Sequence, residues 1–204
     1  MFRLGWQAYR THFGDAVSVV KVRRALALGA VVTVVAAAVM TGLDLAFDWT
    51  GPGAGRAALA VALLSLGVGL VAIACCPIGR PLDPAATING RQVRPDTART
   101  VRGSVQRHLV RTMPAMRPED REAVLTDTLL YRRGVIKDVT QWTPLVVGGL
   151  LASLAALLLG TFSWFIPVWF VVYASNIVTW LHRLGQAERA RLVAETLDPV
   201  RESA

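Results

Sequence analysis

Two aspartates, Asp44 and Asp48, are the acidic residues whose spacing could serve chemistry. They lie one helical turn apart at the end of an apolar run, and two carboxylates so spaced could hold a divalent cation. The alternative interpretation is a pair of solvated acids at the end of a helix. Some membrane phosphotransferases use aspartates at this spacing, but the glycine and arginine pattern around them is missing here, so the sequence favours the solvated pair.

The remaining reactive residue types are isolated from one another. His12, His108 and His182 are far apart in sequence, and Cys75 and Cys76 are adjacent rather than spaced as a zinc or redox pair. The sequence contains no GxSxG, HExxH, P-loop or GxGxxG motif. We therefore predict no catalytic residue, no cofactor and no metal site, and we expect the two cysteines to lie in a membrane span.

An arginine-rich stretch over residues 91–117 is the strongest candidate for ligand contact. Each basic residue close to a membrane contributes about 1 kcal/mol towards an anionic leaflet. We predict that this stretch contacts anionic lipid or a protein partner, with simple topogenic charge as the alternative. Nucleic acid is disfavoured because the stretch lacks aromatic side chains on which bases could stack. The candidate contact residues are Arg91, Arg94, Arg99, Arg102, Arg107 and Arg111.

The composition places these residues on a membrane protein. The 204 residues are 53% hydrophobic and 18% charged, and the charges cluster between long apolar runs. The first run, 25–43, would form a helix of about 28 Å, close to the thickness of the hydrocarbon core. The last run, 144–181, would be about 57 Å long as one helix, so it must fold back. We predict four spans, at about 25–43, 57–78, 145–161 and 164–181.

The charge distribution predicts the orientation of the spans. Of the 22 Lys and Arg residues, Arg56 alone falls on the side of the loop between the first two spans. Basic residues collect in cytoplasmic segments. We therefore predict that the N-terminus, the C-terminus and the middle segment are cytoplasmic, in a bacterial cytoplasmic membrane.

The segments outside the spans complete the predicted architecture, which is all-α and polytopic. Aromatic and valine residues recur on one face of residues 2–20, which predicts an interfacial amphipathic helix. Pro118 and Gly134 suit the start and stop of a helix. The predicted regions are the amphipathic helix 1–24, a first hairpin 25–79, a basic cytoplasmic segment 80–142 with helices at about 97–112 and 118–133, a second hairpin 143–182, and a tail 183–204.

Small residues recur at four-residue spacing in the third predicted span, and small side chains allow two helices to approach closely. An internal helix contact is favoured over an oligomer contact. The only amide side chain within a span is that of Asn176, and such groups usually hydrogen-bond to another helix. The predicted helix-packing residues are Gly148, Gly149, Ala152, Ser153, Ala156 and Asn176.

Three functions fit these features. We favour a non-enzymatic subunit or scaffold of a membrane complex, because the predicted spans contain no Asp, Glu, Lys, Arg or His. The first alternative is a small transporter or channel formed by a parallel homo-oligomer. The second is a membrane enzyme that acts on lipids, which would depend on Asp44, Asp48 and the scattered histidines.

Overall fold

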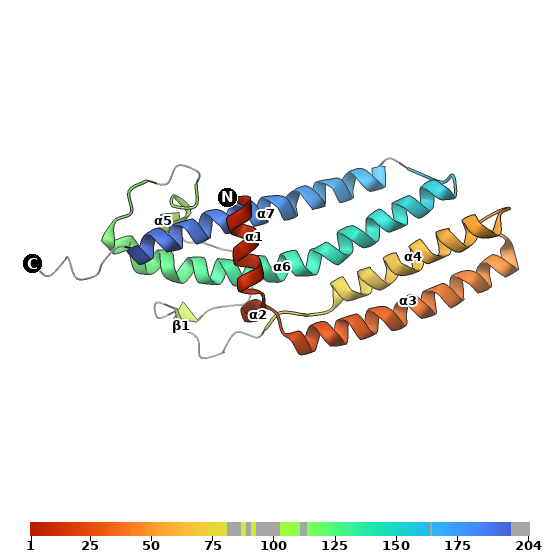
Figure 1. Ribbon diagram of the computed structural model, residues 1–204, viewed down its shortest axis with the longest axis horizontal. Helices are drawn as coiled ribbons and strands as arrows, with labels where there is room; N and C mark the ends of the chain where they lie inside the picture. The colour runs from red at the N-terminus through yellow and green to blue at the C-terminus, as the bar shows by residue number, and fades with distance from the viewer. Residues whose placement is uncertain (81–86, 89–90, 93–102, 111–113, 164, 197–204) are drawn as a thin grey trace, which may run out of the picture. The chain divides into compact units, whose positions relative to one another are not determined.

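The computed structural model shows a mostly helical chain (Figure 1) and describes all residues except 81–86, 89–90, 93–102, 111–113, 164 and 197–204. The chain divides into two compact units. The charged unit comprises Met1–Val17, Gly79–Val139 and Val178–Ala204, and the apolar unit comprises Ser18–Ile78 and Thr140–Ile177. Two long helices, α6 (Pro118–Leu158) and α7 (Phe165–Thr196), each contribute to both units.

The apolar unit begins with a helical hairpin of α3 (Val19–Phe47) and α4 (Ala54–Cys75), which lie side by side in Figure 1. Asp48 adopts a left-handed conformation at φ 47° and ends α3, and Gly51 and Gly53 also have positive φ. The Thr50 amide donates to the Asp44 carboxylate over 3.0 Å. In this structure both aspartates therefore build the turn that joins the two helices.

The hairpin is closely packed because small residues face one another. A Cβ atom built on Gly69 would lie 2.8 Å from the Gly29 carbonyl oxygen and 1.9 Å from the Thr33 Oγ1. Within the described residues, three helices are long and apolar enough to cross a membrane, namely α3, α4 and α6. The structure thus agrees with an all-α membrane protein, whereas the predicted fourth span and the hairpin layout remain predictions.

The charged unit begins with α1 (Phe2–Thr11) and α2 (Phe13–Ala16). The predicted amphipathic helix is therefore shorter than expected, because the chain leaves the helical conformation after α2. Val17 is extended and forms a β-bridge with Gly79, and the Arg80 amide donates to Ala16 over 2.9 Å. These backbone hydrogen bonds, available only from a distant segment, outweigh the helical periodicity of residues 2–20.

The predicted helix stop at Gly134 is wrong, because α6 continues without a break to Leu158. A glycine inside a helix costs only about 1 kcal/mol relative to alanine. Val135, Ile136 and Val139 directly follow Gly134 and are all buried, and burying such side chains contributes roughly 1.5–3 kcal/mol each. Pro118 does begin α6, as predicted.

The predicted helix at 97–112 is also wrong in its described part, since α5 covers only Gly103–Gln106. Tight turns follow, with the His108 amide donating to Val105 over 2.9 Å. These turns bury Val105 and His108 together. Their burial favours the turns over the continuous helix that the sequence predicted. A pair of two-residue strands, β1 (Thr87–Ile88) and β2 (Arg91–Gln92), precedes α5 and was not predicted.

Candidate functional site

The charged unit contains a hydrophobic core assembled from three separate parts of the chain. Val105, Val124, Ala190 and Ala194 form this core, with Leu109 and Met116 packed against it. They come from the α5 region, the first part of α6 and the last part of α7. The Arg121 Nε donates over 3.0 Å to the Ala194 carbonyl, so α6 also supplies a donor to the last turns of α7, where carbonyl groups lack helical partners.

An ion-pair network also joins α6 and α7 in the charged unit. The Glu188 Oε1 accepts hydrogen bonds from the Arg191 Nε and Nη2 over 3.0 and 2.6 Å. The Glu188 Oε2 lies 3.6 Å from the Arg132 Nη1, and the two side chains are only 11% and 10% exposed. Glu188 therefore links α6 to α7, and it is the carboxylate that compensates the buried Arg132 guanidinium.

Burial shapes the chemistry of Arg132. Desolvation lowers the pKa of Arg132, and the Glu188 carboxylate opposes that shift. Among the described residues, the Arg132 Nε and Nη1 have no hydrogen-bond partner. An arginine stays protonated in proteins, so this site is a buried positive charge stabilised mainly by one carboxylate.

The α5 region is fixed by a second polar cluster. Arg107 pairs with Asp120, and the Arg107 Nε lies 3.3 Å from the His108 Nε2. The His108 ring is 1% exposed and its Nε2 lies 3.7 Å from Asp120. This cluster attaches the segment after α5 to the first turn of α6. Arg107, predicted to contact lipid or a partner, thus forms an internal ion pair.

The other predicted basic contacts are mostly outside the described residues. Arg94, Arg99, Arg102 and Arg111 fall there, and only the backbone of Arg91 is described, in β2. The proposed role of this stretch in lipid or partner binding stays a prediction.

The exposed aromatic face of α1 is a second candidate for membrane contact. We define this α1 aromatic face as Phe2, Trp6, Tyr9 and the following Phe13. Phe2 and Trp6 are 46% and 45% exposed. The Trp6 and Tyr9 rings stack at 5.4 Å, and the Tyr9 and Phe13 rings meet edge-on at 5.8 Å. Phe2 and Trp6 thus present aromatic surface to their surroundings, and the half-buried Tyr9 and Phe13 continue it along the chain.

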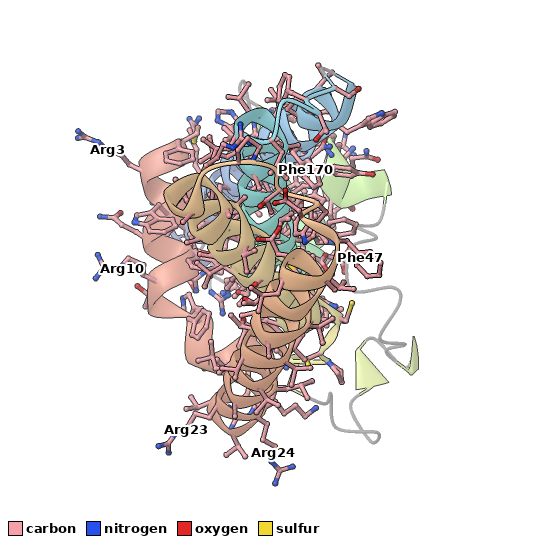
Figure 2. All side chains as sticks on the ribbon, turned by 90° about the vertical axis from the view of Figure 1, so that its right-hand side faces the viewer. Arg3, Arg10, Arg23, Arg24, Phe47 and Phe170 are labelled. Carbon is pink, nitrogen blue, oxygen red and sulfur yellow. The ribbon has the colours of Figure 1, made fainter. Side chains whose placement is uncertain are left out.

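Close contact with α7 explains why the α1 aromatic face is exposed. A Cβ built on Gly5 would lie 1.9 Å from the Leu181 carbonyl oxygen, and one on Gly185 would lie 2.1 Å from the Met1 carbonyl oxygen. The two helices cross in Figure 1, and the close approach of Gly5 and Gly185 belongs to this contact, where Ala8 is also buried. Figure 2 shows Arg3 and Arg10 projecting from α1. Small residues therefore form the packed side and leave the aromatic and basic residues exposed.

The predicted packing residues of the third span lie in the second half of α6. A Cβ on Gly148 would lie 2.8 Å from the Gly67 carbonyl oxygen of α4, and one on Gly149 would lie 1.9 Å from the Phe170 ring of α7. Ser153 is buried and donates to the Gly149 carbonyl over 2.9 Å. Ala152 and Ala156 are half-buried, whereas Asn176 on α7 is exposed.

Sequence reasoning missed several of these residues. Gly5 and Gly185 carry no pattern that reveals a crossing, and the Arg132–Glu188 pair joins positions that are distant in sequence. A partial signal existed for Glu188, Arg191 and Glu195, because their spacing of three and four residues suits ion pairs on one helix. Among the described residues, no group of three or more His, Cys, Asp or Glu residues could hold a metal ion.

Comparison of this chain with protein-family models, with curated proteins and with solved structures found no match. The function must therefore be argued from the geometry of the two units.

Proposed function

We propose that this chain is a non-enzymatic scaffold or subunit of a membrane complex, with four spans and with its charged unit in the bacterial cytoplasm. The observation that carries the proposal is the composition of α6 and α7. Each helix has one charged, packed half and one apolar half, so each joins a folded charged unit to a membrane-embedded unit through continuous helix. A folded unit attached in this way could bind other proteins of a complex and keep them at the membrane.

The α1 aromatic face supports a role at the membrane surface. Aromatic side chains favour the level of the lipid headgroups, and Arg3 and Arg10 would lie beside anionic headgroups. Seven residues separate the end of α1 from the start of α3, and an extended chain of that length spans at most about 25 Å. A connection of that length allows α1 to reach the membrane surface.

A topology experiment tests the four-span arrangement. In a background with Cys75→Ser and Cys76→Ser, we expect Asp48→Cys and Ser163→Cys to react with an impermeant maleimide from the outside of intact cells. Gln7→Cys should react only after the membrane is opened. Protection of Ser163→Cys in intact cells would contradict the third and fourth spans together, because residue 163 lies between them. Labelling of His182→Cys in intact cells would contradict the fourth span alone.

A second prediction concerns the α1 aromatic face. We expect an environment-sensitive fluorophore attached at Trp6→Cys to show blue-shifted emission in nanodiscs of anionic lipid, because position 6 would enter the interface. The matched control is Gln7→Cys, which is exposed on another side of α1 and should report water. The emission spectra of both labelled proteins provide the measurement, and equal water-like spectra would exclude interfacial insertion.

Purification from native membranes in mild detergent tests the scaffold itself. We expect the tagged chain to co-purify with another protein in fixed stoichiometry. Isolation of the chain without any other protein would remove the main support for a scaffold.

A homo-oligomeric transporter or channel is the second candidate, because Asn176 is exposed within the predicted fourth span. Solute flux across liposomes containing the purified chain alone, lost in Asn176→Leu, would favour it over the scaffold.

A further inference from the structure

The apolar half of α7 is poorly covered by its own chain. Between Pro167 and Trp180, all of which are described, no residue of α7 is buried. Its packed side consists of Phe170, which contacts Gly149 of α6, and of Tyr173, which stacks on Trp142 at 5.6 Å. The opposite side of α7 is open between Pro167 and Trp180.

The open side of α7 differs chemically from the open side of α3. From residue 25 to 40, every exposed residue of α3 is Ala, Val or Leu, as expected of a surface that faces lipid. Outside its packed side, the exposed residues of α7 include Ser175, Asn176 and Thr179. A helix face that meets only lipid would not require these polar groups.

Asn176 is the residue that demands a partner. Thr33, Ser65, Ser153 and Ser175 satisfy their hydroxyl groups on carbonyls of their own helices. An asparagine amide has two donors and an acceptor oxygen with two lone pairs. In the part of the chain that the structure describes, the Asn176 side chain has no hydrogen-bond partner. His182 directly follows the predicted fourth span, and Asn176 lies about 9 Å along the helix from it. Asn176 would therefore lie within the hydrocarbon, where an unpaired amide is costly.

We propose that Asn176 pairs with Asn176 of a second copy, across an α7–α7 contact in the membrane. This inference rests on the proposed fourth span. Trp169, Val172, Asn176 and Thr179 follow steps of three, four and three residues, the spacing of a coiled-coil seam. We call these four residues the α7 seam.

The chemistry of the α7 seam favours a second copy as its occupant. Copies inserted with the same topology are parallel, so a two-fold axis along the membrane normal places identical residues opposite one another. An asparagine both donates and accepts, and it is therefore complementary to itself. A polar residue at one seam position also fixes the register of a parallel helix pair. No ionisable residue lies in the α7 seam to repel its counterpart.

Disulfide cross-linking in native membranes tests this contact. In the Cys75→Ser, Cys76→Ser background, Asn176→Cys and Val172→Cys should give covalent dimers on oxidation. The matched control is Val178→Cys, which is exposed on a different side of α7 and should stay monomeric. Equal cross-linking at all three positions, or none at any, would overturn the contact, as would cross-linking of position 176 to a different protein.

Energy transfer between labelled copies in liposomes supplies a second measurement. Asn176→Leu should weaken self-association about three- to thirtyfold, the range that corresponds to interhelical hydrogen bonds in membranes. Asn176→Gln should retain most of it. Unchanged association in Asn176→Leu would contradict the proposal, and would indicate that lipid headgroups or water satisfy the amide.

The two hypotheses fail in distinguishable ways. Protection of Ser163→Cys in the topology experiment, or labelling of His182→Cys in intact cells, removes the fourth span on which the contact depends. Labelling of Ser163→Cys from outside, combined with a monomeric chain in liposomes, leaves the four-span scaffold intact and removes only the α7–α7 contact.

Discussion

Replacing Glu188 with alanine is expected to destabilise the charged unit by roughly 3–5 kcal/mol, the usual cost of removing one partner of a buried ion pair. The substitution leaves the Arg132 guanidinium buried without its nearest carboxylate and also removes both hydrogen bonds from Arg191. Urea unfolding of the detergent-solubilised protein, combined with hydrogen exchange of the α6 amides, measures the loss.

Two controls distinguish a buried pair from charge in general. Glu195 pairs with Arg191 but is 44% exposed, so Glu195→Ala should cost less than about 1 kcal/mol. The double variant Arg132→Met, Glu188→Leu should recover most of the stability lost in Glu188→Ala, because apolar side chains of similar volume can replace a buried ion pair. A Glu188→Ala protein as stable as Glu195→Ala would show that water already reaches this pair.

Replacing Gly148 with leucine is expected to separate α6 from α4. The added Cβ alone would lie 2.8 Å from the Gly67 carbonyl oxygen and 3.2 Å from the Leu70 Cβ, and backbone atoms cannot move aside as a flexible side chain can. Overpacking typically costs about 1–3 kcal/mol, and a clash with backbone should lie at or above the upper end. The measurement is the size of the monodisperse elution peak that remains after the protein is heated in detergent to increasing temperatures. Gly148→Leu should lower the thermal midpoint, the temperature at which half of this peak is lost.

Gly42→Leu is the matched control for this prediction. A Cβ on Gly42 of α3 meets nothing within 4 Å, so a leucine there should leave the thermal midpoint nearly unchanged. If Gly148→Leu and Gly42→Leu shifted the midpoint equally, the α4–α6 contact would not be the cause.

The membrane-embedded part of this chain could be read from local patterns. A charge-free apolar run is sufficient to predict α3, because its composition alone determines the preferred solvent and its length matches a bilayer. Pro118 marks the start of α6 for an equally local reason, since proline is tolerated in the first turn of a helix. Gly160, with φ 73°, ends the last turn after α6, where the sequence predicted a reversal.

Contacts between distant segments had no such signal. Whether Gly134 stops a helix depended on the burial of Val135 and Ile136, which their own neighbours do not reveal. The side of α1 that packs was likewise set by Gly185, far along the chain. The aromatic periodicity predicted only that one face of this helix differs from the others.

The sequence by itself therefore determined the membrane character, the order of the apolar segments and the concentration of basic residues outside them, because each depends on local composition and length. Tertiary structure alone decided that Glu188 compensates Arg132, that Gly5 and Gly185 bring α1 onto α7, and that Asn176 stays exposed. Each of these depends on which distant side chains share a small space, and that is a property of packing rather than of any single segment.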